Sequence, residues 1–137
     1  KWKPATLQKR IDLMQHFVIS AFLASSTDNA LAQATGLFKE MSDSRGGSGF
    51  SFADLAADRA GVEFGTMAVA SEQSALNLQQ LVAQGLEEND FMPDITNLPE
   101  QIQENHFKQR YGTTEDKRYQ LMQDELDRRI RLCRLYQ

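Results

Sequence analysis

Side chains able to do chemistry are concentrated in the first half of the chain. They fall into pairs three or four residues apart, and residues with that spacing share one face of a helix. Imidazole and carboxylate groups serve in acid–base catalysis and as ligands of transition metals. The residues of interest are His16, Ser20, Glu40, Asp43, Asp54 and Asp58.

A metal site is one chemistry that these residues suggest. His16 with Glu40, Asp43 or Asp58 would supply a mixed nitrogen and oxygen ligand set for Zn²⁺, Mn²⁺ or Fe. The spacing of Glu40 and Asp43 resembles the Glu-x-x-His of di-iron bundles only loosely. Our candidate metal ligands are His16, Glu40 and Asp58. No cofactor is expected otherwise, and a divalent metal ion is the alternative kept open.

Catalysis without a metal is a second possibility. Glu40 at a helix end, with a carboxylate across a loop, is the minimal pair for glycoside hydrolysis. A Ser20 nucleophile is less suitable, because a serine four residues from His16 on the same helix leaves little room for a substrate and an oxyanion hole. The catalytic residues are therefore unknown, with His16, Glu40, Asp43 and Asp58 as candidates.

Each of these residues also has a purely structural interpretation. Ser51 and Asp54 match a capping box, in which the serine oxygen accepts from the Asp54 N–H and the carboxylate returns to the Ser51 N–H. Asp43 would help to end a helix, and Glu40 would pair with the adjacent lysine. For His16 the competing interpretation is a hydrogen bond to a carboxylate inside a helical bundle.

The glycine-rich segment RGGSG, residues 45–49, separates two expected helices. Glycine accepts the positive φ that ends a helix at low cost. An ordered glycine loop that presents two phenylalanines could bind a partner or an envelope polymer. The candidate binding loop consists of Gly46, Gly47, Gly49, Phe50 and Phe52.

The elements that would position these residues are helices, because apolar residues recur every three to four positions and strand-like alternation is almost absent. We predict an all-α, single-domain bundle of about five to six helices, with a core over residues 5–88 and a C-terminal helical extension over residues 99–136 packed on it. Helices three and four could be continuous or separate. The expected helices are Ala5–Ala24, Asn29–Ser42, one that starts after Ser51, Ser71–Glu88, Pro99–Arg110 and one from the Thr113–Asp116 segment to Leu135.

Two features of the expected helices predict how they pack. The second half of the first helix is apolar on all sides, which indicates that the fold encloses it. The third helix carries small residues at four-residue intervals, and such a smooth ridge allows close approach of the first or second helix. The ridge consists of Ala53, Ala57, Gly61 and Gly65.

Composition excludes several classes of protein. The net charge of −4 and the absence of an evident basic face argue against a nucleic-acid-binding role. Cys133 is the single cysteine, so an intrachain disulfide and a cysteine-based metal site are excluded. No stretch reaches the ~20 apolar residues that span a bilayer. Because the chain begins at Lys1, we expect that a signal peptide, an anchor or a cloning boundary lay upstream, and that any membrane association used such a segment.

The segments QHFVISAFLASS and GLFKEMSDSRGGSGFSFADLAADRAGVEFG together resemble small uncharacterised bacterial envelope proteins and lipoproteins. Those proteins share a pattern HFxxSAxL…KExxD…GGSGFSxxDLxADxxG. The match spans residues 15–65, and the C-terminal third lies outside it. The resemblance implies a bacterial, exported protein of the periplasm or outer envelope and carries over no activity. The matching residues are His16, Ser20, Lys39, Glu40, Asp43, Gly46, Gly47, Gly49, Asp54, Asp58 and Gly61.

The sequence leaves two classes of function open. The first is an envelope-associated binding or structural protein with a polar His/carboxylate cluster between its helices. The second is a hydrolase, metal-dependent or acting on glycans, that uses the same cluster. The substrate, the partner and the oligomeric state do not follow from the sequence.

Overall fold

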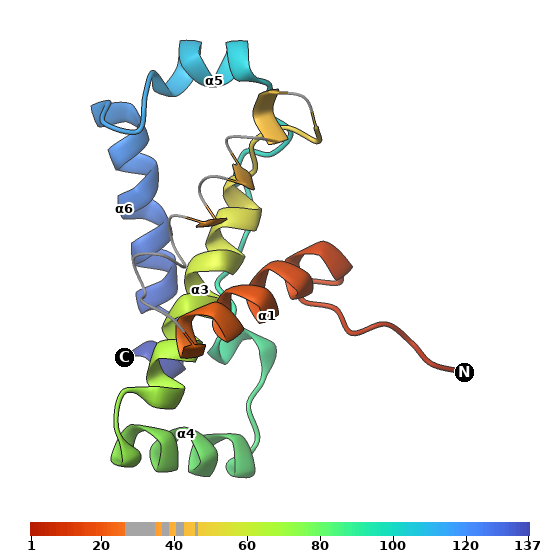
Figure 1. Ribbon diagram of the computed structural model, residues 1–137, viewed down its shortest axis with the longest axis vertical. Coiled ribbons are helices and arrows are strands. Elements are labelled where there is room, and N and C mark those ends of the chain that lie inside the picture. The colour runs from red at the N-terminus through yellow and green to blue at the C-terminus, as the bar shows by residue number, and fades with distance from the viewer. Residues whose placement is uncertain (27–34, 37–38, 41–42, 46) are drawn as a thin grey trace.

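Two helices that cross at close range, α1 (Ile11–Ser26) and α3 (Phe52–Val69), form the centre of the fold (Figure 1). The computed structural model describes residues 1–26, 35–36, 39–40, 43–45 and 47–137. Helix dominates the described chain, and β-structure within it is limited to isolated bridges. The predicted all-α bundle is therefore confirmed.

The ridge of small residues on α3 is what allows the two helices to cross so closely. A Cβ atom added at Gly61 would collide with the backbone carbonyl of Phe17, and one added at Gly65 would collide with that of Ala21. Ala57 on the same ridge is fully buried. The predicted close packing against the first helix is confirmed, and it fixes which residues of α1 face α3.

The chain begins differently from the prediction, because α1 starts at Ile11 rather than near Ala5. A tight turn precedes it, in which the backbone groups of Leu7 and Arg10 bond each other in both directions. Gln8 and Lys9 have φ values of 50° and 61°, as the central residues of a type I′ turn require. Leu7 is thus buried by a turn and not by a helix.

The third and fourth helices are separate. α3 ends at Val69, and α4 (Glu72–Gln84) begins after Ser71, whose hydroxyl accepts a hydrogen bond from the Ser74 N–H at 3.0 Å. This serine cap gives the chain a new helix start and a change of direction (Figure 1). Leu78 is the only described residue of α4 that is fully buried, so this helix packs loosely on the rest of the molecule.

The C-terminal half returns to the core through an extended segment. A short 3₁₀ helix, η1 (Glu88–Asp90), precedes it, and α5 (Glu104–Tyr111), α6 (Lys117–Arg131) and a final 3₁₀ turn, η2 (Arg134–Tyr136), follow. The prediction that a helix starts at Pro99 is wrong. The Pro99 carbonyl instead accepts from the Phe52 N–H, and Ile102 forms a β-bridge with Phe50.

An aromatic cluster joins the start of α3 to α5 and α6. Phe50 packs on Phe52 and Phe107 with ring centroids 4.9 and 4.7 Å apart, and Phe52 also contacts Tyr111 at 5.0 Å. Tyr119 of α6 completes the cluster at 6.0 Å from Phe107. The C-terminal helices therefore hold the segment that leads into α3, beside the polar residues of interest.

The expectation that the fold encloses the second half of α1 is wrong. Phe17 is buried against α3, but Val18, Ile19 and Phe22 are each more than half exposed. The close α1–α3 contact covers one side of the helix, and the described residues leave the opposite side uncovered. Within the described chain, no helix combines the length and the hydropathy needed to cross a membrane.

We expect Gly61→Ala to lower the free energy of unfolding by about 1–3 kcal/mol, since the added methyl group meets the Phe17 carbonyl and the helices must move apart. Helix propensity alone predicts the opposite sign, a gain of about 1 kcal/mol. Urea denaturation monitored by circular dichroism measures the difference. Glu63→Ala, at an exposed position of the same helix, is the matched control and should change stability by less than about 0.5 kcal/mol. A Gly61→Ala protein as stable as the native one would show that the ridge is not in tight contact.

Candidate functional site

The crossing of α1 and α3 brings His16 and Ser20 of one helix against Asp54 and Asp58 of the other. Each pair is four residues apart, so each presents two polar groups on one helix face. Gly61, one turn beyond Asp58, lets α1 lie close enough for short contacts. The sequence predicted a His/carboxylate cluster between helices, and the structure places His16 and Asp58 together in such a cluster.

The imidazole of His16 lies between carboxylates on both of its nitrogen atoms. Nδ1 is 2.9 Å from Asp58 Oδ1, and Nε2 is 3.3 Å from Asp54 Oδ2. Nε2 is also 3.9 Å from Oε1 of Glu40, which comes from the helical residues 39–40. The side chain of His16 is nearly buried. The candidate site is therefore an imidazole enclosed by three acids.

Glu40 is the most deeply buried of these acids. Its side chain has no exposed surface, and its Oε2 accepts a hydrogen bond from the backbone N–H of Ser51 at 3.0 Å. The predicted capping box is thus half right. Ser51 Oγ accepts from the Asp54 N–H as expected, but Glu40 takes the place of the Asp54 carboxylate on the Ser51 N–H. The predicted surface pair of Glu40 with its neighbouring lysine is wrong.

Because Glu40 binds the Ser51 N–H, the Asp54 carboxylate can face the imidazole. The sequence did not predict this role, because the capping motif already explained Asp54. The sequence feature that pointed to it was the four-residue spacing to Asp58. On the other side Oδ1 of Asp54 lies 3.7 Å from the Arg10 guanidinium, which also binds Asp12 and Glu100. Nothing in the sequence singled out Arg10, because its contacts with Asp54 and Glu100 arise only from the fold.

Ser20 supports the site and is not placed to act as a nucleophile. Its hydroxyl donates to Asp58 Oδ1 at 2.9 Å, the same oxygen that contacts His16. A catalytic serine would instead donate its proton to the imidazole. Ser20 therefore helps to fix the orientation of Asp58.

Asp43 does not join the cluster. It contacts the ammonium group of Lys39 at 3.4 Å, and its backbone carbonyl accepts from the N–H groups of Gly47 and Gly49. This is the helix-ending role foreseen as its structural alternative. Lys39 itself lies close to the site, with Nζ 3.4 Å from Nε2 of His16.

The candidate binding loop does not present its aromatic residues. Phe50 and Phe52 are fully buried in the aromatic cluster, so the hypothesis that they contact a partner is wrong. Gly49, with φ of 88°, packs against the backbone of Gln101, where any Cβ atom would collide. Gly47 lies against Asp43, and Gly46 lies outside the described residues.

Burial and mutual repulsion control the protonation of the cluster. Burial, followed by the negative charge of Asp54, raises the pKa of Glu40 to about 7. For His16, burial lowers the pKa, but hydrogen bonds to Asp54 and Asp58 outweigh it and raise the pKa to about 10. Near neutral pH, without a bound metal ion, His16 therefore keeps its proton and Glu40 is partly protonated.

Several buried carboxylate oxygens in the cluster lack a hydrogen-bond donor among the described residues. They are Oε1 of Glu40, Oδ1 of Asp54 and Oδ2 of Asp58. Burying an unpaired acceptor costs free energy, and a carboxylate costs more than a neutral group. Such atoms call for a proton, a water molecule or a cation.

His16, Glu40 and Asp54 together could hold a metal ion. One ligand atom from each lies within 4.8 Å of the other two. The set differs from the predicted one in that Asp54, and not Asp58, faces Nε2. A cavity of about 140 Å³ lies on the Asp58 side of the imidazole and is lined by His16, Asp58 and Lys39 among others. A wider hollow of about 370 Å³, beside Asp54, is lined by Arg10, Ser48 and Glu100 among others.

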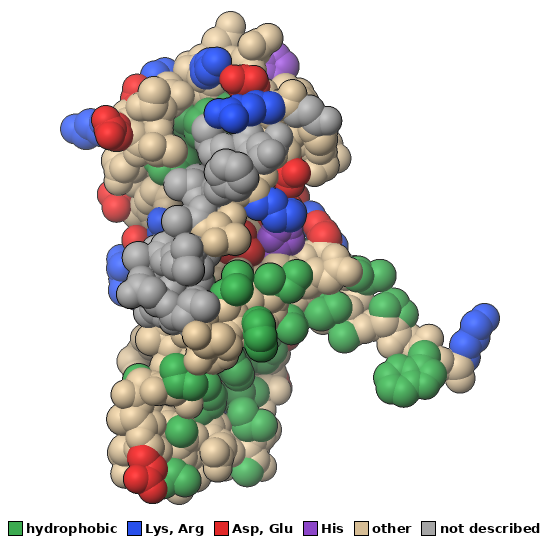
Figure 2. All heavy atoms as spheres, in the orientation of Figure 1, with side chains coloured by type: hydrophobic (Ala, Val, Ile, Leu, Met, Phe, Trp, Pro, Cys, Tyr) green, Lys and Arg blue, Asp and Glu red, His purple; other side chains and the backbone are tan. Residues whose placement is uncertain are grey.

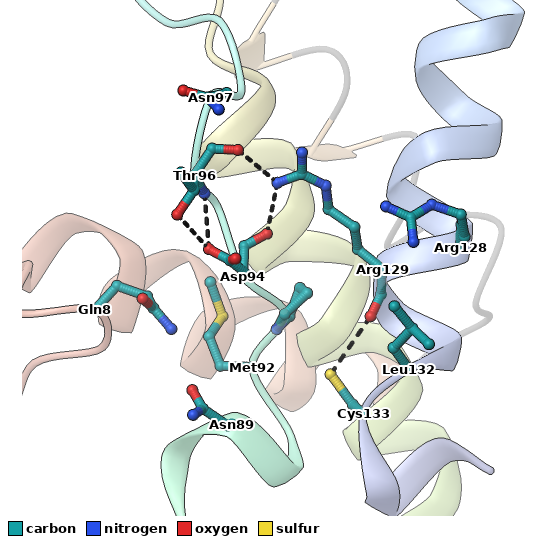
Figure 3. Close-up of a pocket in the computed structure, with 11 residues that line it drawn as sticks. Gln8, Asn89, Met92, Asp94, Thr96, Asn97, Arg128, Arg129, Leu132 and Cys133 are labelled. Carbon is teal, nitrogen blue, oxygen red and sulfur yellow. Dashed lines mark hydrogen bonds between the residues drawn. The ribbon is translucent and has the colours of Figure 1, made fainter.

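A larger hollow of about 480 Å³ lies elsewhere, between α6 and the segment after η1 (Figure 3). Arg129 donates there to the carbonyl groups of Asp94 and Thr96, both at 2.8 Å. Cys133 borders it, and burial raises the pKa of this thiol to about 11. Asp94, Thr96 and Arg129 bond one another in this hollow, so we place the functional site at His16.

Comparison of the chain with protein-family models, with curated proteins and with solved structures found no match. The functional argument therefore rests on the geometry of the cluster.

We expect the metal-free protein to lose stability as pH rises from about 5 to about 9. Glu40 titrates near 4.5 when unfolded and near 7 when folded, so the stability due to its bound proton falls across that interval. His16 titrates at 6.5 unfolded and about 10 folded, so its contribution is complete below 6.5 and is lost toward 10.

Urea denaturation in the presence of a chelator, repeated across this pH range, measures the trend. His16→Gln should flatten the alkaline part of the profile and Glu40→Gln the acidic part. A stability that rises steadily with pH in the native protein would contradict the assigned protonation states.

Proposed function

We propose that this protein is an envelope-associated binding protein that holds a divalent transition-metal ion between its helices, with His16, Glu40 and Asp54 as ligands. The observation that carries the proposal is the convergence of Nε2, Oε1 and Oδ2 in a buried place, where Oε1 of Glu40 has no hydrogen-bond donor among the described residues. The envelope location rests on the resemblance of residues 15–65 and belongs to the proposal.

The distances are close to those that a metal requires. Bonds of about 2.0–2.2 Å to nitrogen and oxygen place neighbouring ligand atoms about 3–3.5 Å apart. Nε2 of His16 is 3.3 Å from Asp54 and 3.9 Å from Glu40. Closing around an ion thus requires small side-chain movements.

The surroundings of His16 favour metal binding at Nε2. A metal-bound histidine nearly always donates its other N–H to a carboxylate or carbonyl group, which fixes the tautomer and the ring orientation. Asp58 is placed for this at Nδ1, and Ser20 in turn orients Asp58. A metal ion would replace the proton on Nε2, which lies 3.3 Å from Asp54 and 3.9 Å from Glu40. The Lys39 ammonium group, 3.4 Å from Nε2, belongs to an exposed side chain that can move away.

Charge also favours a cation here. Without a bound ion, His16 and Glu40 hold protons at neutral pH, and these protons limit the repulsion among the acids of the site. A divalent ion replaces those protons, so binding releases them and tightens as pH rises. One imidazole and two carboxylates suit Zn²⁺, Mn²⁺ or Fe²⁺ better than Mg²⁺ or Ca²⁺, which prefer oxygen ligands alone.

We expect Zn²⁺ or Mn²⁺ to raise the melting temperature. An ion at one hundred times its dissociation constant adds about 2.7 kcal/mol, or roughly 10 °C for a chain of this size. Differential scanning fluorimetry with chelator, Zn²⁺, Mn²⁺ or Mg²⁺, together with calorimetric titration, measures the effect. Glu40→Gln keeps an acceptor for the Ser51 N–H but loses the charge, so it should fold and lose the shift.

Glu63→Ala, an acid removed from the same helix outside the cluster, should keep the full shift. A melting temperature unmoved by every ion, or a shift that Glu40→Gln and His16→Gln retain, would contradict the proposal.

A metal-dependent hydrolase is the second candidate, supported by one observation. The set provides three protein ligands, of which His16 borders a cavity of about 140 Å³ and Asp54 a hollow of about 370 Å³, and catalytic zinc sites keep an open position for water. Hydrolysis of an activated ester by the zinc-loaded protein, absent in Glu40→Gln, would favour it. Complete burial of Glu40 argues against the glycan-cleaving version, since its carboxyl group cannot reach a glycosidic oxygen.

A further inference from the structure

The uncovered side of α1 carries large apolar side chains in close succession. Val18, Ile19 and Phe22 are 53, 59 and 66% exposed. Figure 2 shows hydrophobic side chains that follow α1 and continue over the part of the molecule formed by α3 and α4. We call the exposed side of α1, formed by Val18, Ile19 and Phe22, the apolar face. Val69 of α3 and Leu76 and Val82 of α4 are also large, exposed apolar residues. Exposed apolar surfaces of this kind mark sites of association.

Acidic and basic side chains are scarce around the apolar face. Asp, Glu, Lys and Arg make up 25% of the chain, yet residues 13–26 contain none of them and residues 64–86 contain only Glu72. Asp12, at the start of α1, is already paired with Arg10 at 2.6 Å. A surface with few charged side chains can be buried at low cost, because each buried charge would need a partner.

The chain before α1 has the opposite character. Residues 1–6, which we call the arm, are all exposed and extend away from the helices (Figure 1). The arm contains Trp2, fully exposed, between Lys1 and Lys3, and Lys9 follows it. The first acidic residue of the sequence is Asp12. Tryptophan and lysine together are typical of segments at the headgroup level of a membrane.

We propose that the apolar face and the arm bind the surface of a bilayer that contains anionic phospholipid. Phe22 and its apolar neighbours enter the interfacial region, Trp2 lies among the headgroups, and the lysines contact phosphate groups. Attachment by this surface differs from the membrane anchor that an upstream segment could provide, and it is independent of the metal site.

Charge complementarity selects a bilayer over a second copy of the chain. The arm and the turn after it offer Lys1, Lys3 and Lys9, whereas residues 13–26 and 64–86 offer Glu72 as their single acid, so a symmetric dimer would leave most of these lysines unpaired. Anionic lipids provide both a negative surface for the lysines and an apolar layer for Phe22. A bilayer with anionic lipid therefore matches both the lysines of the arm and the apolar face.

The single tryptophan makes the test direct. Vesicles of phosphatidylcholine mixed with phosphatidylglycerol should shift the emission of Trp2 to shorter wavelength and carry the protein upward in a flotation gradient, and vesicles of phosphatidylcholine alone should do so less. Phe22→Ser should weaken partitioning by about tenfold, as expected for removing one buried aromatic side chain from the interface. Replacing Lys1 and Lys3 with Gln should abolish the preference for anionic vesicles.

Leu121→Ser is the matched control, because Leu121 is 59% exposed but lies on α6, outside the apolar face. This variant should bind as the native protein does. The proposal is overturned by absence of binding to both kinds of vesicle, or by binding that Phe22→Ser leaves unchanged. It is also overturned if sedimentation without vesicles shows a dimer that Phe22→Ser dissociates, since the apolar face would then join two copies.

Discussion

The close crossing of α1 and α3 is the constraint on which the rest of the structure depends. Gly61 and Gly65 remove the side chains that would keep the helices apart, and their backbones meet those of Phe17 and Ala21. A crossing of this kind has one register, because sliding by one residue would place a Cβ atom against a carbonyl group. The register sets His16 against the carboxylates of α3, so small apolar packing residues determine the polar site.

Without a bound ion, the cluster lowers the stability of the fold, and this cost is the main physical argument for a ligand. Three carboxyl groups and one imidazole lie in a space that is nearly free of water. Bound protons must therefore reduce the negative charge that water would otherwise solvate. Glu40 shows the tension most clearly, since its Oε2 is satisfied by Ser51 whereas its Oε1 has no donor from the described chain. Stability alone would be served as well by apolar residues in these places.

The sequence predicted the all-α fold and the close α1–α3 contact because both follow from local spacing. It also predicted that His16 would meet carboxylates such as Asp58, because each lies on a helix expected to pack beside the other. It assigned Asp54 to a helix cap, because the local motif explained that residue completely; only packing shows that Glu40 supplies part of the cap. It left Phe50 exposed in a loop, because the bridge to Ile102 joins segments far apart in the chain and leaves no local trace.

The lone cysteine gives the molecule a natural probe of its own opening. Cys133 follows α6, is nearly inaccessible to solvent, and keeps its proton because burial disfavours the thiolate. A thiol reagent can modify it only when the C-terminal segment separates from the core. The modification rate therefore reports the frequency of that local unfolding without any added label.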